Sequence, residues 1–555
     1  MYFRKLPVMI LLAASIPIAA CQLDDRDDEA AVAAALAADP CTSDAIIAIT
    51  PAVIPPTRAG VPVVLDIAVT NPNPATCADR TLDLHVLDTG LLLDPRPGRP
   101  TQLVLASGAT GHVTVTATAP ASADAGDVLQ ASFIAADPPQ PGGPIAFPPQ
   151  GTAVSAPFTV AATPGCQVSS SHELMITSVS VVDDPIRTVF DPTSRDPRNG
   201  VWTFKHLVEG MARRPEDAPA MVEAMLATFT ADRTINGFTV AARPGLQAQV
   251  LAAWPRLPSG ALDLAKAPLR LQAIVNRFDL RNLDAGDAGE GRFVFAFNLE
   301  PVPGAPPPEA TIIFEYKLPA RNDRDVERWA RSFHVLGRLP FGEAYNLVLQ
   351  LITEQFVRRG ARPGFPNGSA INAVRTNELP FGDNNLWELR ELHLSPTTGR
   401  LEPSALELTP DFGFNNSAKL ASYINANPAQ IIAEHHVVPD QLDGAPFKAG
   451  AVFNNLTTWL APGVDNEARH HFAINTCNGC HAVEETGTAF LHLVPRAAGT
   501  EARRSRWLTG TIVDDRVTGT PRSFDDLGRR KADLAAVVCG SPATATLRNG
   551  IRRTH

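Results

Sequence analysis

Short runs of alternating apolar and polar residues, separated by Pro, Gly and Asn, fill residues 45–163. In the run "HVTVTAT", Val113 and Val115 fall on one face of a strand, while Thr114 and Thr116 fall on the other. A period of two is typical of a strand with one buried face, and turn residues at regular spacing are typical of antiparallel sheets. The pattern therefore predicts an antiparallel β-sandwich over this segment.

The pattern changes after Cys166, because residues 166–462 mix helical and strand periods. Residues 341–359, "FGEAYNLVLQLITEQFVRR", carry apolar residues at helical spacing, whereas residues 310–320, "ATIIFEYKLPA", alternate as a strand does. Helices and strands that do not alternate strictly favour an α+β body over a doubly wound parallel sheet.

Charged residues lie within these predicted strands, and the segment "FEYKL" is an example. In one interpretation, Phe314, Tyr316 and Leu318 face the core, and Glu315 and Lys317 pair on a face open to water. In the other, carboxylates and arginines of several strands gather in a cleft. The body has no nucleophile elbow, zinc-protease helix or phosphate loop, so the sequence identifies no enzyme here.

The first twenty residues have the pattern of an export signal. A basic start precedes an apolar run over residues 6–20 that is too short for a permanent membrane span. The segment Ile18-Ala19-Ala20-Cys21 resembles the bacterial lipoprotein box. The resemblance implies a signal peptide over residues 1–20, lipid on the Cys21 sulfur and a tether over residues 21–44. It also implies a place in the cell envelope, at the outer membrane or the periplasmic face, with the membrane as a partner through the anchor.

Composition limits the other partners and the pairing of the cysteines. A formal net charge of −10 over 555 residues argues against nucleic acid, which binds basic surfaces. Unpaired thiols are uncommon in exported proteins, and the chain has seven cysteines, of which the lipid takes Cys21. If Cys477 and Cys480 carry a cofactor, four cysteines remain; spacing favours Cys41 with Cys77, which leaves Cys166 with Cys539, although the sequence does not fix the connectivity.

The segment "NTCNGCH" places Cys477, Cys480 and His481 in the pattern Cys-x-x-Cys-His. Two cysteines three apart on one helical turn put both sulfurs on one side, with the imidazole next to them. This pattern resembles the attachment motif of c-type cytochromes. The resemblance implies one covalent haem c on both cysteines, His481 as proximal iron ligand, and a small, mainly helical cytochrome c-like domain over residues 463–555. Since no methionine follows Met225, His492 is the candidate distal ligand, ahead of His435, His436, His470 and His471.

Other interpretations of the two cysteines stay open: a thiol–disulfide exchange pair, a structural disulfide, or a zinc site completed by His481 and Cys539. The haem interpretation predicts a lipid-anchored protein for electron transfer or haem-based redox chemistry, with a redox partner protein that the sequence does not identify. The alternative is a non-catalytic binding or structural lipoprotein stapled by disulfides, without haem. The layout of residues 45–163 resembles immunoglobulin-like modules of bacterial surface proteins. The body is similar to uncharacterised exported lipoproteins, which implies no activity.

Overall fold

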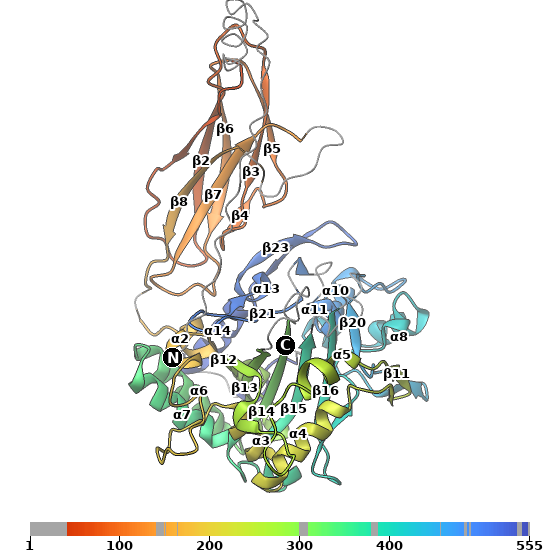
Figure 1. Ribbon diagram of the computed structural model, residues 1–555. Helices are drawn as coiled ribbons and strands as arrows, with labels where there is room; N and C mark the ends of the chain where they lie inside the picture. Colours follow the sequence, from red (N-terminus) through yellow and green to blue (C-terminus); the bar gives the residue numbers. More distant parts are fainter. Residues whose placement is uncertain are drawn as a thin grey trace, which may run out of the picture.

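The computed structural model describes residues 41–139, 149, 151–163, 165–298, 309–378, 387–454, 457–481, 486–487, 490–540 and 547–552. The predicted signal peptide, the lipidated Cys21 and most of the tether lie outside the described residues. Within these ranges, no helix combines the length and the apolar character needed to cross a bilayer. An elongated domain of strands projects from a larger body (Figure 1).

Residues 46–159 form two four-stranded antiparallel sheets around a shared apolar core. One sheet has the order β1-β2-β6-β4 (Ile46–Thr50, Pro62–Thr70, Thr110–Thr118, Leu92–Asp94), and the other β5-β3-β7-β8 (Thr101–Leu105, Arg80–Val86, Val128–Ala136, Thr152–Thr159). Val113 and Val115 of β6 are buried in this core, whereas Thr114 between them is exposed. A disulfide joins Cys41, ahead of β1, to Cys77 between β2 and β3, which is the pairing that the spacing favours.

One antiparallel sheet of eight strands forms the centre of the body. Its order is β17-β16-β15-β14-β13-β12-β9 (Leu401–Ser404, Trp387–Leu394, Ile371–Glu378, Ala310–Pro319, Asp287–Phe297, Leu269–Arg277, Met175–Ile176), and β20 (Val452–Asn454) also pairs with β16. Successive side chains of a strand point to opposite faces, so this sheet presents two different surfaces.

Helices cover the apolar face of the sheet. Phe314 of β14 contacts Phe204 of α3 (Phe204–Met211), with ring centroids 5.5 Å apart, and Tyr316 contacts Phe356 of α7 (Glu343–Val357) at 5.7 Å. Trp329 of α6 (Asp323–His334) packs against the same Phe356 at 6.2 Å. Shorter elements include α2 (Val179–Val182), α4 (Ala218–Ala227), α5 (Pro244–Leu246), α8 (Ala418–Ala426), α9 (Pro428–Ile432), β10 (Arg233–Ile235), β11 (Phe238–Val240), β18 (Gln441–Leu442) and β19 (Ala445–Pro446).

The C-terminal region is not a separate helical domain. The fold prediction, an immunoglobulin-like β-sandwich, an α+β body and a small, mainly helical cytochrome c-like domain, is therefore wrong for this mainly β, multidomain chain. Ile474, Trp507 and Leu534 belong to the same apolar core as the central sheet. The local sequence pattern of residues 463–555 predicted helices, but it carried no information on which distant strands these helices pack against. The elements are α10 (Asn466–Ile474), α11 (Cys477–Cys480), β21 (Leu493–Val494), β22 (Arg503–Arg504), α13 (Arg506–Thr509), β23 (Thr511–Asp514), β24 (Pro521–Phe524) and α14 (Asp526–Val538).

The C-terminal region also contacts the sandwich, through polar groups. Asp514 of β23 pairs with Arg96 and Arg99, each at 2.6 Å. Lys531 of α14 lies 2.9 Å from the Asp124 carboxylate. These contacts place the C-terminal region between the sandwich and the central sheet, as Figure 1 shows for β23 and α13.

The second face of the central sheet carries a buried row of charges, so the expected face open to water is wrong. Arg292 lies 2.6 Å from Glu290 and 2.9 Å from Glu315. Arg375 in turn lies 3.2 Å from Glu315 and 2.9 Å from Glu391, so the row crosses four neighbouring strands. These five residues are at most 5% exposed. Burial raises the pKa of Glu315 to about 7.

Removal of one member of this row should destabilise the fold, because it leaves buried carboxylates without their cation. We expect Arg375→Met to lower the free energy of unfolding by about 3–5 kcal/mol, measured by urea denaturation. The same substitution at the exposed Arg214, which pairs with Asp217 at 2.8 Å, should change little. Equal effects of the two substitutions would contradict a stabilising role for the row.

Candidate cofactor site at the Cys-x-x-Cys-His motif

The motif occupies a single, tightly capped helical turn. The Thr476 hydroxyl accepts a hydrogen bond from the Gly479 N–H at 3.1 Å, which caps the start of α11. Position 479 admits only glycine, since a Cβ there would collide with the Ala473 carbonyl oxygen. Cys477 and Cys480 are both fully buried on this turn, and neither belongs to the two disulfides of the described chain. The sequence "TCNGC" therefore encodes the turn as well as the two thiols.

His481 follows this turn with its ring held in one orientation. Its Nδ1 is hydrogen-bonded to the backbone carbonyl of Phe490, and its ring stacks on Trp387 with centroids 4.6 Å apart. A carbonyl only accepts, so Nδ1 carries the proton and Nε2 is the ring nitrogen with the lone pair. Burial lowers the pKa of His481 to about 4, which keeps the imidazole neutral at physiological pH. A neutral ring with a fixed tautomer is what metal ligation requires.

His492, the candidate distal ligand, lies directly beside His481. The two ring centroids are 4.1 Å apart with the ring planes tilted by 36°, and the Trp507 ring stacks on His492 at 4.7 Å. Because the two rings are in direct contact, there is no room between them for a metal ion. His492 thus lies against His481 with a tilted ring, and it would have to move away to serve as a distal ligand.

Hydrogen bonds hold His492 in this place. Its Nδ1 lies 2.8 Å from the Ser505 hydroxyl, and its Nε2 lies 3.4 Å from the Cys480 sulfur. Burial lowers the pKa of His492 well below its usual value. The structure thus brings Cys480 and both histidines of the sequence prediction into direct contact.

The other candidate histidines make different contacts. His436 packs against Phe472 at 6.2 Å, and His470 lies against Phe524 at 6.0 Å. His471 pairs with Glu467 at 3.2 Å, and His435 lines a separate pocket with Arg552. Cys539 is bound to Cys166 in a disulfide, which rules out the zinc site that would have used it.

A cavity separates the motif from the charged face of the sheet. Its volume is about 60 Å³, well below the roughly 300–1,000 Å³ that is typical of small-molecule and cofactor pockets, so a haem would fit here only after the lining side chains move apart. Apolar side chains make up much of its wall, and His481, His492 and three arginines complete it. The lining residues are Met175, Val275, Arg277, Arg292, Val294, Thr311, Ile313, Asn377, His481, His492, Leu493, Trp507, Leu508 and Arg530.

Arg530 of α14 is the unusual member of this lining. It is 3% exposed, and its Nε and Nη1 have no hydrogen-bond partner among the described residues, although its Nη2 pairs with Asp526 at 2.5 Å. Burial, together with the neighbouring Arg277, lowers its pKa to about 9. A buried guanidinium with unpaired N–H groups at a cavity wall suits an anionic group such as a carboxylate.

These residues fit a covalently attached haem in their chemistry. Two buried thiols on one turn, a neutral imidazole with its lone pair on Nε2, apolar walls and the N–H groups of Arg530 match the vinyl, iron, porphyrin and propionate parts. The sequence revealed the thiols and His481 through their spacing. It did not reveal Trp387, Trp507 or Arg530, since the four-residue spacing from Asp526 to Arg530 is typical of a solvated ion pair on a helix.

Comparison with protein-family models gives no match for this chain, and a search of curated proteins gives none either. Function is therefore inferred from the residues and their geometry.

The buried neutral state of His481 makes stability depend on pH in haem-free protein. The unfolded imidazole has a pKa of about 6.5, whereas the folded one has a pKa of about 4. Between these values the unfolded chain binds a proton that the folded chain does not, so stability falls as the pH falls, by about 1.4 kcal/mol per pH unit. Between pH 6 and 4.5, the free energy of unfolding should change less steeply with pH in His481→Phe than in the wild type. The difference in slope should be about 1.4 kcal/mol per pH unit. An unchanged slope in urea titrations would contradict the buried neutral ring.

Proposed function

We propose that this chain is a lipid-anchored protein of the bacterial cell envelope that carries one covalent c-type haem and transfers electrons to or from a partner protein. Cys477 and Cys480 would hold the haem through thioether bonds, and His481 would be the proximal iron ligand. His492 is the nearest histidine for the distal position. The observation that carries the proposal is the buried Cys-x-x-Cys-His turn, whose imidazole is fixed as the neutral Nδ1–H tautomer by the Phe490 carbonyl.

The residues around the motif would perform three tasks. The Phe490 carbonyl and the Trp387 ring would orient the proximal imidazole, and the Phe490 bond would increase its basicity. The apolar wall would exclude water, which favours a stable redox centre. Arg530 would pair with a propionate through N–H groups that have no partner in the described chain. When bound, the haem supplies a one-electron redox couple.

The lipid on Cys21 would hold this redox centre at the membrane surface. Several acyl chains on one cysteine give stable anchoring, where a single chain binds only marginally. The two disulfides are consistent with an oxidising compartment. A redox partner would therefore be sought in the envelope.

A second function is supported by the packing of the site, because the rings of His481 and His492 are in contact and Cys480 lies 3.4 Å from His492. In this alternative, the site is a closed structural core, Cys477 and Cys480 form a third disulfide in the mature protein, and the chain is a non-catalytic binding or structural lipoprotein. Covalent haem is the property that separates the two functions.

The haem proposal is tested by a pyridine haemochrome spectrum of protein produced in a host with active cytochrome c maturation. We expect a c-type α-band in the wild type that is lost in the Cys477→Ala/Cys480→Ala variant. The matched control is Cys41→Ala/Cys77→Ala, which removes two other cysteines and should keep the band. A colourless wild type from this host would refute the haem proposal and favour the disulfide-stapled alternative.

The anchor proposal predicts that Cys21→Ala transfers the protein from the membrane fraction to the soluble envelope fraction. The reason is that the substitution removes the sulfur that would take the lipid. Fractionation followed by immunoblotting measures the change, with Cys166→Ala as a control that keeps the predicted lipoprotein box. Membrane association that survives Cys21→Ala would contradict lipid anchoring at this residue.

A further inference from the structure

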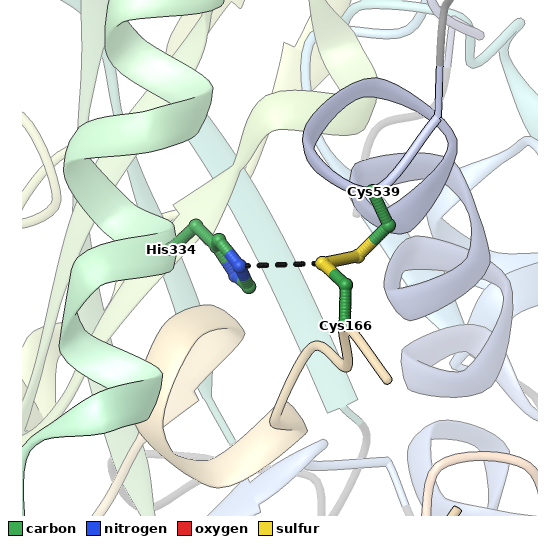
Figure 2. Close-up of side chains that lie close together, drawn as sticks. All are labelled: Cys166, His334 and Cys539. Atoms are coloured by element: carbon green, nitrogen blue, oxygen red, sulfur yellow. Dashed lines mark hydrogen bonds between the residues drawn. A yellow bond between two sulfur atoms is a disulfide. The ribbon is translucent and has the colours of Figure 1, made fainter. Parts of the chain in front are cut away.

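The disulfide between Cys166 and Cys539 joins two distant parts of the chain. Cys166 begins the body, Cys539 follows the last turn of α14, and 373 residues separate them. Figure 2 shows the bond beside His334, whose Nε2 lies 3.6 Å from the Cys166 sulfur. Cys166 is exposed to solvent, and Cys539 is at least partly exposed. The bond is therefore open to an attacking thiol.

His334 is held in this position by a carboxyl group. It is the last residue of α6, and its Nδ1 lies 2.9 Å from the Glu173 carboxyl oxygen Oε2. The other oxygen of Glu173 accepts the Ser169 N–H at 2.9 Å. Glu173 is fully buried, and the backbone of Gly337 lies so close to Oε1 that a side chain at that position would collide with it. Sulfur, imidazole and carboxyl group thus form a line with fixed geometry.

The chemistry of the disulfide decides where the protons are in this line. A disulfide sulfur carries no hydrogen, so the contact with His334 is a hydrogen bond only when Nε2 carries the proton and donates it. Nδ1 is then the acceptor, and the Glu173 carboxyl group must be protonated to donate to it. Burial raises the pKa of Glu173 to about 8 and lowers that of His334, which agrees with this arrangement. The other charged groups that act on the pair are Asp124, Arg331, Arg338 and Lys531.

We propose that the Cys166–Cys539 bond is an exchange-active disulfide whose reduction is assisted by His334 as proton donor, with Glu173 as the positioning residue behind it. The thiolate of a dithiol reductant forms a bond to the Cys539 sulfur. The sulfur–sulfur bond breaks, and its electron pair leaves on Cys166. Nε2 of His334 gives its proton to this sulfur, and the Glu173 proton moves to Nδ1.

A second displacement completes the reaction. The second thiol of the reductant, after loss of its proton to water, attacks the mixed disulfide and releases the Cys539 thiolate, which takes a proton from water. The reductant leaves as a cyclic disulfide, and two protein thiols remain. Reduction removes the covalent link between Cys166 and the end of α14. This helix carries Arg530, which lines the cavity.

The test measures reduction of each disulfide in the full-length protein by dithiothreitol at pH 7, with alkylation and peptide mass spectrometry. Cys41–Cys77 is an internal control in the same chain. General acids typically contribute roughly 10²–10⁴-fold to a rate, and we expect His334→Asn to slow reduction of Cys166–Cys539 at least about ten-fold while Cys41–Cys77 is unchanged. An unchanged or faster rate in folded His334→Asn protein would overturn the proposal.

A second variant keeps the test decisive if His334→Asn does not fold, as judged by thermal unfolding. In the wild type, the rate of Cys166–Cys539 reduction, divided by the concentration of dithiothreitol thiolate, should be constant below pH 8. It should fall above pH 8, because Glu173 loses its proton there. Glu173→Gln should give a lower rate without this fall. A wild-type profile without the fall, or one that Glu173→Gln reproduces, would contradict the proton relay.

Discussion

The buried charge row on the central sheet is the constraint on which the rest of the structure depends. Charges removed from water are tolerated only when each has a partner in good geometry. Arg375 lies between carboxylates of the two strands beside its own, and Arg292 lies between Glu290 of its own strand and Glu315 of the next strand. A shift of one residue in the register of any of these strands would turn its charges to the apolar face. The pairing of the row and the register of the sheet therefore fix each other.

The same constraint places the Cys-x-x-Cys-His motif. The charge row must be covered so that water is excluded. The C-terminal region forms this cover, and hydrogen bonds and ion pairs hold it on the body. Arg496 bonds the Leu271 carbonyl of β12 at 3.0 Å and pairs with Asp183 at 2.7 Å. Arg529 of α14 pairs with Asp279 at 2.8 Å. A cofactor at the motif would thus lie between the central sheet and α14.

Local patterns predicted strand β14 of the central sheet and helix α7, since their apolar residues repeat at one period over many residues. Spacing also favoured Cys41 with Cys77, which left Cys166 with Cys539, and the described residues form these two disulfides. The sequence could not show that the polar face of β14 is buried, because the segment that covers it lies far along the chain. For the same reason it could not show that Trp387 stacks on His481. Short-range periodicity records which face of an element is apolar, but not what covers the other face.

The central claim is that Cys477 and Cys480 carry haem. Trypsin cleaves after Arg469 and Arg496, and the peptide between them, residues 470–496, contains the complete motif and no other cysteine. The most direct test is the mass of this peptide, determined by mass spectrometry on protein from a host with active cytochrome c maturation. We expect the peptide to carry the mass of one haem attached to both cysteines. A peptide with two unmodified thiols, or with a disulfide between them, would contradict it.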